Sequence, residues 1–489
     1  MRKKSFITVT DQFCGAGGSS IGATNAGAEV RLAMNHWRLA IDTHNTNFPN
    51  VDHDCADMSA VNPRRYPTTD ILITSPECTN HSLAKGKKRQ PYEKDLFGKV
   101  LIDPAEERSR ATMWDVPRFA EYHDYRIIIV ENVVDAAKWV MWDAWLIAMR
   151  ALGYEHEVVY FNSMFAWPTP QNRDRMYIVF WKAGNRKPDL EFRPLAHCHQ
   201  CAKDVEAIQT WKKRVKWGRY KRQYFYRCPS CHVEVTPYYY AGFNAIDFTI
   251  PTQRIGDRET PLAPKTIERI KYGLETYGRN PLIVTGRYTS GIECRVKDAR
   301  TEAIPTQPGD SSHGVVLPWL IETAHSSGDA RHYVRGSADP IPTQTTAQTM
   351  GVVSAFLSKQ YGGGANPKHM GVGLHHPTGT ITTQDHHALL ESRAFFSYYY
   401  KNHQASGINE PLGTMTTLEK TSMVQFLESL KIEDLYYRML QPREIGKAMA
   451  FPQKYVVLGN GRQQVRQYGN AVTPPAMEML IKRCVATFQ

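Results

Sequence analysis

One cysteine, Cys78, stands in a setting that suits a nucleophile. It lies in the segment Thr74-Ser-Pro-Glu-Cys-Thr-Asn-His-Ser, directly after the apolar run that ends at Ile73. This pattern predicts a loop at the carboxyl end of a strand, where open α/β sheets bind their ligands. A thiolate in such a loop can attack an electrophilic carbon, whereas a lone cysteine elsewhere is more often a buried apolar residue. The position of Cys78 therefore favours nucleophilic chemistry.

An acid and two cations are candidates for the same chemistry. Glu131 ends the apolar run Arg126-Ile-Ile-Ile-Val, where a carboxylate needs a partner or a purpose, and capping of a following helix is the alternative. Arg173 and Arg175 are two residues apart at the start of an expected strand, so their side chains point the same way. Taken singly they would be surface arginines. Together with Cys78 and Glu131 they form a set of a thiol, an acid and paired cations.

A glycine-rich turn near the N-terminus predicts a cofactor site. The segment Asp11-Gln-Phe-Cys-Gly-Ala-Gly-Gly-Ser-Ser follows an apolar β run and precedes a helical stretch, so its glycines fall where backbone approaches a ligand closely. A dinucleotide fingerprint would place an acidic residue about 20 positions further on, but Arg31 stands there. The turn favours a cofactor with an amino-acid moiety and no phosphate; a purely structural turn is the alternative.

Four cysteines form two pairs with the spacing of metal ligands. Cys198-His-Gln-Cys201 and Cys228-Pro-Ser-Cys231 predict a structural Zn²⁺ held by four thiolates, with no position left open for catalysis. Residues 211–227, between the pairs, interleave cations with aromatic residues. A basic hairpin of this kind contacts phosphates and can stack on bases, and a solvated hairpin is the alternative. Loss of zinc is expected to unfold residues 198–231.

Composition limits the class of protein. The chain has 489 residues, enough for two or three folded units, and a net charge of +12 that favours a polyanionic partner. It has nine cysteines, an odd number that fits a reducing compartment better than a disulfide framework. The N-terminus lacks the apolar stretch of a signal peptide, so we expect a soluble, cytoplasmic protein without a membrane partner.

The sequence pattern divides the chain into three parts. Residues 1–188 alternate apolar runs with amphipathic stretches, which predicts an α/β domain around a mostly parallel sheet. Residues 189–431 predict a mostly β region, with the zinc ribbon at 195–235 and repeated β units at 280–425. These repeats either read DNA or form a purely structural array. Residues 432–489 regain a helical pattern and are expected to return to the first domain.

Six segments resemble, in order, the motifs of the DNA cytosine-5 methyltransferase family. They are Phe13-Cys-Gly-Ala-Gly-Gly, Pro76-Glu-Cys, Glu131-Asn-Val, Gln171-Asn-Arg-Asp-Arg, Arg438 through Pro452 and Gly469-Asn-Ala-Val. The family carries its target-recognition domain between the fourth and fifth of these motifs. The resemblance implies a Rossmann-like, S-adenosylmethionine-dependent methyltransferase domain of the bacterial or phage type. The mostly β, zinc-ribbon-containing region would then be the target-recognition insert.

The resemblance also implies the role of each site residue. Trp37 would stack near the adenine of S-adenosylmethionine, and Asp57 would bond the adenine amino group. The residues implied in cofactor binding are Phe13, Gly15, Ala16, Gly17, Gly18, Trp37, Asp57 and Asn470.

The reaction that the resemblance implies is methyl transfer to C5 of cytosine. Cys78 would add to C6 of a flipped-out cytosine while Glu131 binds N3 and the exocyclic amine, and Arg175 bonds O2. C5 would then attack the sulfonium methyl group, and loss of the C5 proton with elimination of the thiol would restore the base. Arg173 belongs to the same catalytic set.

Two departures from the family pattern leave the exact donor open. Glu77 stands where the family usually has a second proline, and the ribose-binding acid after the second strand is missing, since its place falls on Asn35 or His36. The expected partner is double-stranded DNA, bound by a monomer in a bacterial cell or a phage-infected bacterium. The alternatives are a tRNA cytosine-5 methyltransferase and a catalytically silent DNA-binding relative. The intact catalytic set argues against the silent relative.

Overall fold

The computed structural model describes residues 6–77, 112–247 and 432–488 and parts of the chain between 250 and 391. The chain forms two compact units. The first comprises Met1–Asp247, Thr252–Pro318 and Leu435–Gln489, and the second comprises Phe248–Pro251 and Trp319–Asp434. In the part of the chain that is described, no helix is long and apolar enough to cross a membrane.

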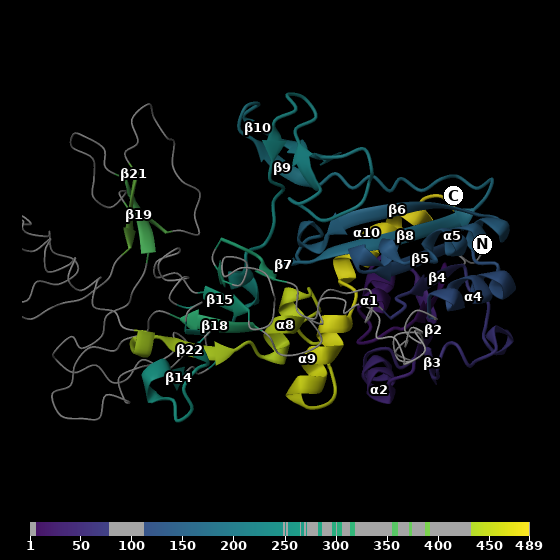
Figure 1. Ribbon diagram of the computed structural model, residues 1–489, viewed down its shortest axis with the longest axis horizontal. Coiled ribbons are helices and arrows are strands. Elements are labelled where there is room, and N and C mark those ends of the chain that lie inside the picture. The colour runs from purple at the N-terminus through teal and green to yellow at the C-terminus, as the bar shows by residue number, and fades with distance from the viewer. Residues whose placement is uncertain are drawn as a thin grey trace, which may run out of the picture. The chain divides into compact units, whose positions relative to one another are not determined.

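A seven-stranded sheet is the centre of the first unit, with the order β3-β2-β1-β4-β5-β8-β6 (Figure 1). Its strands from β1 to β5 run parallel to one another, whereas β8 runs antiparallel to both β5 and β6. The mixed sheet agrees with the predicted α/β methyltransferase domain. Chain order reverses between β1 and β4, which makes this position a topological switch point. The strands are β1 (Thr8–Gln12), β2 (Glu29–Asn35), β3 (Asp52–Cys55), β4 (Ile71–Thr74), β5 (Ile127–Asn132), β6 (Tyr154–Asn162) and β8 (Asp174–Lys182).

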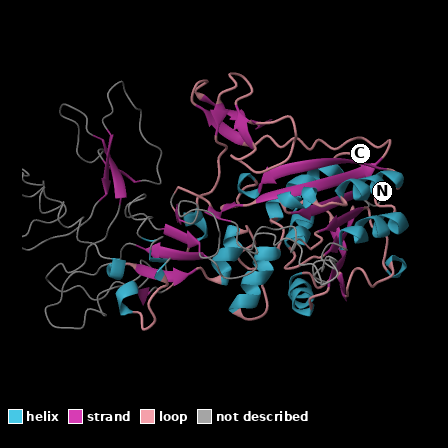
Figure 2. Cartoon of the chain, in the orientation of Figure 1, coloured by secondary structure: helices cyan, strands magenta, loops and turns pink. Residues whose placement is uncertain are grey.

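Helices cover both faces of this sheet (Figure 2). The helices α1 (Gly18–Asn25) and α10 (Pro474–Val485) share a buried apolar cluster with one face, and α4 (Asp115–His123) and α5 (Trp142–Ala151) share another with the opposite face. Because both faces are buried, β5 is a continuous apolar run rather than an alternating one. A further helix, α2 (Arg38–Asn47), follows β2.

The C-terminal segment packs on α1 through two glycines. A Cβ added to Gly22 would lie 2.6 Å from the carbonyl oxygen of Pro474, and one added to Gly18 would lie 2.0 Å from that of Val472. Larger residues would therefore separate α1 from α10. The segment also contains α8 (Pro442–Ala448) and α9 (Gly461–Asn470), each of which begins with a capping box.

The four-cysteine element, residues 195–235, belongs to the first unit. Two small sheets build it, one of β9 and β10 and one of β11, β12 and β13. The side chains of Tyr224 and Tyr226 are buried in the same apolar cluster as α4 and α5. The bounds of these strands are β9 (Leu195–Cys198), β10 (Lys203–Glu206), β11 (Ile208–Trp211), β12 (Tyr224–Arg227) and β13 (Glu234–Val235).

Antiparallel strands occur where the predicted repeats have apolar runs. In the first unit β15 pairs with β18, and in the second unit β19 pairs with β21. Much of the rest of residues 280–425 lies outside the described part of the chain. The strands of this region are β14 (Gln253–Arg254), β15 (Leu282–Thr285), β16 (Val296–Asp298), β17 (Ile304–Pro305), β18 (His313–Leu317), β19 (Ala355–Lys359), β20 (Gly371–Gly373) and β21 (His387–Glu391). Two further strands pair with some of them, β22 (Tyr436–Met439) with β14 and β18, and β7 (Gln171–Asn172) with β17.

Candidate active site

The carboxyl edge of the parallel strands gathers most of the predicted site residues. The turns and loops after β1, β2, β3 and β5 lie along this edge, and β8 begins there because it runs the opposite way. The predicted residues found along it are Phe13, Gly15, Ala16, Gly17, Gly18, Trp37, Asp57, Glu131, Arg173 and Arg175.

Cys78 lies outside the described residues, but the segment that leads to it is described. Strand β4 ends at Thr74 at the same edge of the sheet and pairs directly with β5. The side-chain amide of Asn132 donates a hydrogen bond of 3.4 Å to the carbonyl oxygen of Pro76. The Pro-Glu-Cys segment therefore contacts the strand end that carries Glu131.

Glu131 and Arg175 form a largely buried ion pair. The Arg175 Nε lies 2.8 Å from the Glu131 Oε1, and these side chains are 13% and 10% exposed. A second guanidinium nitrogen of Arg175 donates to the carbonyl oxygen of Asp174 at 2.9 Å, which fixes the plane of the guanidinium. Glu131 is thus held by a cation rather than serving as a helix cap, and its carboxylate stays close to the sheet edge.

Arg173 has different partners from Arg175. Its buried guanidinium donates to the carbonyl oxygens of Gly469 at 3.2 Å and Ala471 at 2.9 Å. These two carbonyls flank Asn470, whose side chain is exposed at the end of α9. Arg173 therefore positions the segment that carries a predicted cofactor residue. The sequence predicted that the two arginines act together. It could not indicate that Arg175 binds Glu131 whereas Arg173 binds the C-terminal segment.

The glycine turn after β1 combines three residues in the left-handed region. Phe13 has φ +57°, Gly15 has φ +53° and Gly17 has φ +86°. A Cβ on Gly17 would lie 2.4 Å from the Tyr455 hydroxyl, so this glycine permits contact with the C-terminal segment. Among the described residues, a Cβ on Gly15 would meet nothing closer than the Phe13 carbonyl oxygen at 3.8 Å. Gly15 thus leaves an approach to the backbone that a ligand can use.

A buried polar network beneath this turn was not predicted. Asp11 accepts hydrogen bonds of 2.6 Å from the hydroxyls of Ser19 and Ser20, and the Ser20 hydroxyl is 2.9 Å from His44 Nε2. The other nitrogen of His44 lies 2.8 Å from His53. Burial raises the pKa of Asp11 to about 6 and lowers the pKa of His44 to about 3. The network fixes the first turn of α1 against β1.

The two departures from the family pattern lie side by side. The Glu77 carboxylate is 3.7 Å from His36 Nδ1, so the unexpected acid lies beside a position where the family's ribose-binding acid is missing. Next to His36, the half-buried ring of Trp37 lies 4.7 Å from the guanidinium of Arg466 on α9. Asp57 is exposed and accepts a hydrogen bond of 3.0 Å from the backbone N–H of Ser59. These residues present polar and aromatic groups at the carboxyl ends of β2, β3 and β4.

Comparison with known proteins agrees with this geometry. The family model described as C-5 cytosine-specific DNA methylase matches residues 7–224 and 358–486, more than half of the chain. The chain belongs to the C-5 cytosine-specific DNA methylase family.

Individual relatives match the chain over shorter stretches. The type II methylase M.HgiEI of Herpetosiphon aurantiacus is 29% identical over 175 residues, which are 35% of this chain and 36% of the relative. The type II methyltransferase M.HgiCII of the same organism is 25% identical over 217 residues, 43% of this chain and 45% of the relative. The chain thus spans less than half the length of either relative. A crystal structure of a Spodoptera frugiperda DNMT2 variant covers 98% of this chain and 99% of its own at 13% identity, with a TM-score of 0.47.

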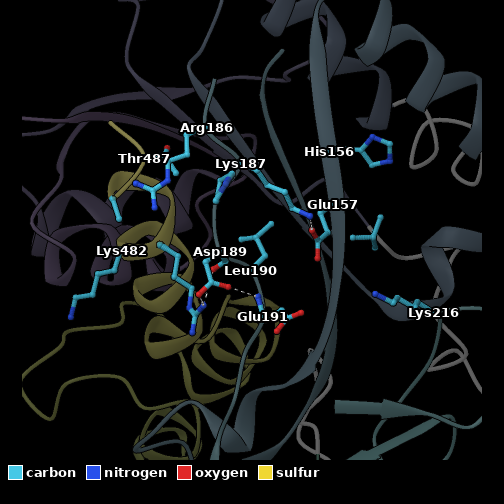
Figure 3. Close-up of a pocket in the computed structure, with 14 residues that line it drawn as sticks. His156, Glu157, Arg186, Lys187, Asp189, Leu190, Glu191, Lys216, Lys482 and Thr487 are labelled. Carbon is cyan, nitrogen blue, oxygen red and sulfur yellow. Dashed lines mark hydrogen bonds and ion pairs between the residues drawn. The ribbon is translucent and has the colours of Figure 1, made fainter. Parts of the chain in front are cut away.

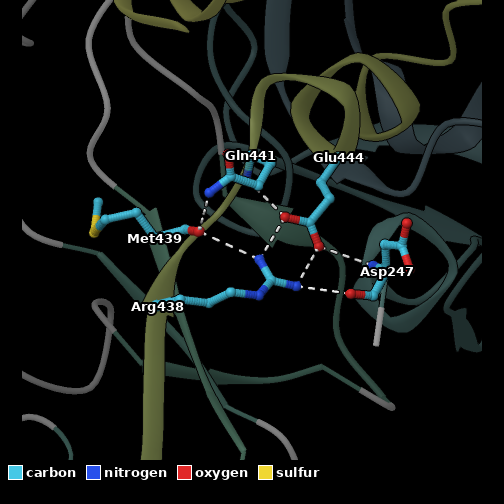
Figure 4. Close-up of polar contacts among 5 residues, drawn as sticks. All are labelled: Asp247, Arg438, Met439, Gln441 and Glu444. Carbon is cyan, nitrogen blue, oxygen red and sulfur yellow. Dashed lines mark hydrogen bonds and ion pairs between the residues drawn. The ribbon is translucent and has the colours of Figure 1, made fainter. Parts of the chain in front are cut away.

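A buried ion pair fixes the segment that resembles the family's penultimate motif (Figure 4). Glu444 is fully buried and accepts hydrogen bonds of 2.6 and 2.8 Å from the guanidinium of Arg438. It also accepts from the backbone N–H groups of Gln441 at 2.7 Å and Asp247 at 2.8 Å. The ion pair links β22 to α8. Glu444 also binds the backbone of Asp247, the residue at which the chain first leaves the first unit.

The four predicted metal ligands come together. The sulfur atoms of Cys198, Cys201, Cys228 and Cys231 all lie within 4.8 Å of one another, with Cys198 and Cys231 at 3.4 Å and Cys201 and Cys228 at 3.8 Å. A Zn–S bond of about 2.3 Å in a tetrahedron separates sulfurs by about 3.8 Å, so the spacing fits that ion.

A large surface pocket lies away from the site residues (Figure 3). It has a volume of about 1000 Å³ and is lined by charged residues of β6, the chain after β8 and the end of α10. The ion pairs Lys187–Glu157 and Arg483–Asp189 occupy it. None of the predicted site residues lines this pocket.

Proposed function

We infer that this protein transfers a methyl group from S-adenosylmethionine to C5 of a flipped-out cytosine in a short duplex DNA sequence. The observation that carries this proposal is the buried Glu131–Arg175 pair of 2.8 Å, beside the backbone that leads to Cys78. An acid that is held by a cation next to a nucleophile segment is what addition of a thiol to a pyrimidine requires.

The chain's own residues would carry the steps at the base. Cys78 would form a covalent bond with C6 while Glu131 binds N3 and the exocyclic amine, which withdraws electrons from the ring. Arg175 would bond O2 and hold the Glu131 carboxyl in place. After methylation a base would remove the C5 proton, and the Cys78 thiolate would leave. The cytosine must be flipped out, because these atoms are not accessible in a stacked duplex.

S-adenosylmethionine would supply an electrophilic methyl group when bound. The open approach to the Gly15 backbone, beside the half-buried ring of Trp37, supports a cofactor with an adenine and an amino-acid end. Asn470, held in place through Arg173, would close the site from the C-terminal side. The other residues in this proposed binding set are Phe13, Ala16, Gly17, Gly18 and Asp57.

Duplex DNA is the proposed substrate, bound by a monomer in a bacterial cell or a phage-infected bacterium. The net charge of +12 suits a polyanion, and both relatives compared above are named as type II enzymes that methylate. We also propose that the four thiolates hold a structural Zn²⁺ and that residues 189–431 form the recognition region. The alternatives are methylation of tRNA and a DNA-binding relative without activity.

Incubation of the purified chain with methyl-labelled S-adenosylmethionine separates these possibilities. One reaction contains unmethylated genomic DNA and another contains unmodified tRNA, and both are analysed by nucleoside mass spectrometry. We expect 5-methylcytosine in the DNA, confined to one sequence context on base-resolution sequencing. Label in tRNA alone would support the tRNA enzyme, and label in neither substrate would support the silent relative.

A further inference from the structure

The hairpin between the two cysteine pairs makes three directed contacts with the segments that carry the pyrimidine-binding residues. Trp217 donates its indole N–H to the carbonyl oxygen of Val134 at 3.0 Å. Arg219 pairs with Asp135 at 2.5 Å. The backbone N–H of Tyr220 donates to the Asp174 carboxylate at 3.0 Å.

These contacts reach both sides of the Glu131–Arg175 pair. Val134 and Asp135 begin the short helix directly after β5, a few residues beyond Glu131. Asp174 is the first residue of β8 and the neighbour of Arg175 in the chain. The hairpin therefore contacts both of the backbone segments that carry the acid and its cation.

The aromatic residues of the hairpin serve this packing. Tyr220 and Tyr226 contact the ring of Phe165 edge-on at centroid distances of 4.9 and 5.3 Å, and Trp211 contacts Tyr160 at 5.8 Å. Because Tyr220, Tyr224 and Tyr226 are buried, they are not available to stack on DNA bases, which was one possibility for residues 211–227. Several cations of the hairpin are exposed, whereas the Arg219 side chain is only 25% exposed.

We propose that this hairpin is a positioning element for the pyrimidine pocket, and that Arg219 acts through Asp135 to set the place of Glu131 against Arg175. The inference rests on the proposed function, because it concerns the rate of the same methyl transfer. It predicts that damage to these contacts slows the reaction of bound DNA more than it weakens DNA binding.

The test compares three variants of the full-length protein. Arg219→Gln removes the ion pair with Asp135, whose carboxylate keeps Lys138 at 3.3 Å, and Arg219→Lys keeps the charge. The control, Arg31→Gln, breaks an exposed ion pair with Glu29 on β2. For each variant we would measure the single-turnover methyl-transfer rate, the Kd for DNA and the Kd for S-adenosylhomocysteine. Thermal unfolding reports whether each variant is folded.

We expect Arg219→Gln to lower the single-turnover rate about tenfold or more, since a displacement of about 1 Å in a reacting group can cost about 100-fold. Both Kd values should stay within about twofold of wild type, and Arg219→Lys should restore most of the rate. Arg31→Gln should leave the rate unchanged, because its ion pair with Glu29 is exposed and neither residue belongs to the proposed site. An Arg219→Gln rate equal to that of Arg31→Gln would overturn the proposal.

Trp217→Phe keeps the test decisive if Arg219→Gln does not fold. This substitution keeps an aromatic ring beneath Lys138 and removes the donor to Val134. Slower transfer at unchanged DNA affinity supports the proposal, and an unchanged rate overturns it. Wild-type protein that methylates no substrate would instead count against the proposed function.

Discussion

At the scale of single residues, the chemistry of the site depends on which partner each charged side chain contacts. The Glu131 carboxylate meets Arg175, Arg173 meets backbone carbonyls, and Glu77 meets His36. Each of these residues was recognisable in the sequence, but its partner was not, because the partners come from other strands or from the C-terminal segment. Residue type thus predicts the kind of chemistry, and tertiary contacts decide which residue performs it.

Replacement of Glu131 by glutamine should remove most of the activity and also lower the stability, because the largely buried Arg175 loses its charged partner. An amide of the same size leaves Arg175 in place but cannot share a proton with N3 of the base, so we expect methyl transfer to fall by about 100-fold or more. Single-turnover rates and thermal unfolding of the variant would check this. Near-normal turnover by a folded Glu131→Gln protein would contradict the assigned role.

The buried Asp11 should make stability depend on pH in a defined direction. Its pKa is raised from 3.8 to about 6, so the folded state binds the proton more tightly than the unfolded state does. The contribution of Asp11 to the free energy of unfolding is therefore most favourable below about pH 4, falls as the pH rises to about 6, and is constant above that. The total change in this contribution is about 3 kcal/mol. His44 acts in the opposite direction, because its pKa is lowered.

The difference between wild type and Asp11→Asn isolates this contribution. Urea unfolding of both proteins from pH 4 to pH 7 should show a difference in free energy of unfolding that shifts in favour of the variant as the pH rises. A difference that does not vary with pH would mean that Asp11 does not titrate in this range in the folded protein.

At the scale of secondary-structure elements, segments far apart in the sequence fix one another. The strand positions followed from short apolar runs, since a strand buried on both faces has a recognisable pattern. The contact of α1 with α10 through Gly18 and Gly22 was not predictable, because a small residue in a helix does not indicate what packs against it. Likewise, alternating cations and aromatic residues did not indicate that the aromatic side chains of the hairpin face inward.

The Arg438–Glu444 pair should be a large local contribution to stability. Glu444→Gln would leave the buried guanidinium of Arg438 without its charged partner, and breaking such a pair typically costs about 3–5 kcal/mol. Urea unfolding would measure the loss. The exposed pair of Lys482 with Glu478 offers a control, because Glu478→Gln should cost no more than about 1 kcal/mol. Equal losses in the two variants would contradict this account of the penultimate motif.

Metal removal should damage the four-cysteine element selectively. The purified chain should contain one zinc ion, and a strong chelator should unfold residues 198–231 and weaken DNA binding more than binding of S-adenosylhomocysteine. Elemental analysis and calorimetric titration with each ligand would test this. Absence of zinc from protein that was never exposed to a chelator would contradict the metal assignment.

At the scale of the whole molecule, one edge of one sheet explains why motifs spread along the chain act together. The switch point between β1 and β4 brings the glycine turn, the Pro-Glu-Cys segment and Glu131 to neighbouring strand ends, and the C-terminal segment returns to the same unit. The order of motifs predicted this clustering, since parallel strands share their carboxyl edge. Whether the predicted β repeats contact bases could not be decided from the sequence, because base contact depends on which side chains reach the groove edges.

The most direct test of the central claim is covalent trapping at Cys78. Duplex DNA that carries 5-fluorocytosine at the methylated position would be incubated with the protein and S-adenosylmethionine, because fluorine at C5 cannot leave as a proton does and so blocks elimination of the thiol. The account predicts a stable protein–DNA adduct that peptide mass spectrometry locates at Cys78 and that Cys78→Ser does not form. An adduct at another residue, or methylation of cytosine by the Cys78→Ser protein, would contradict it.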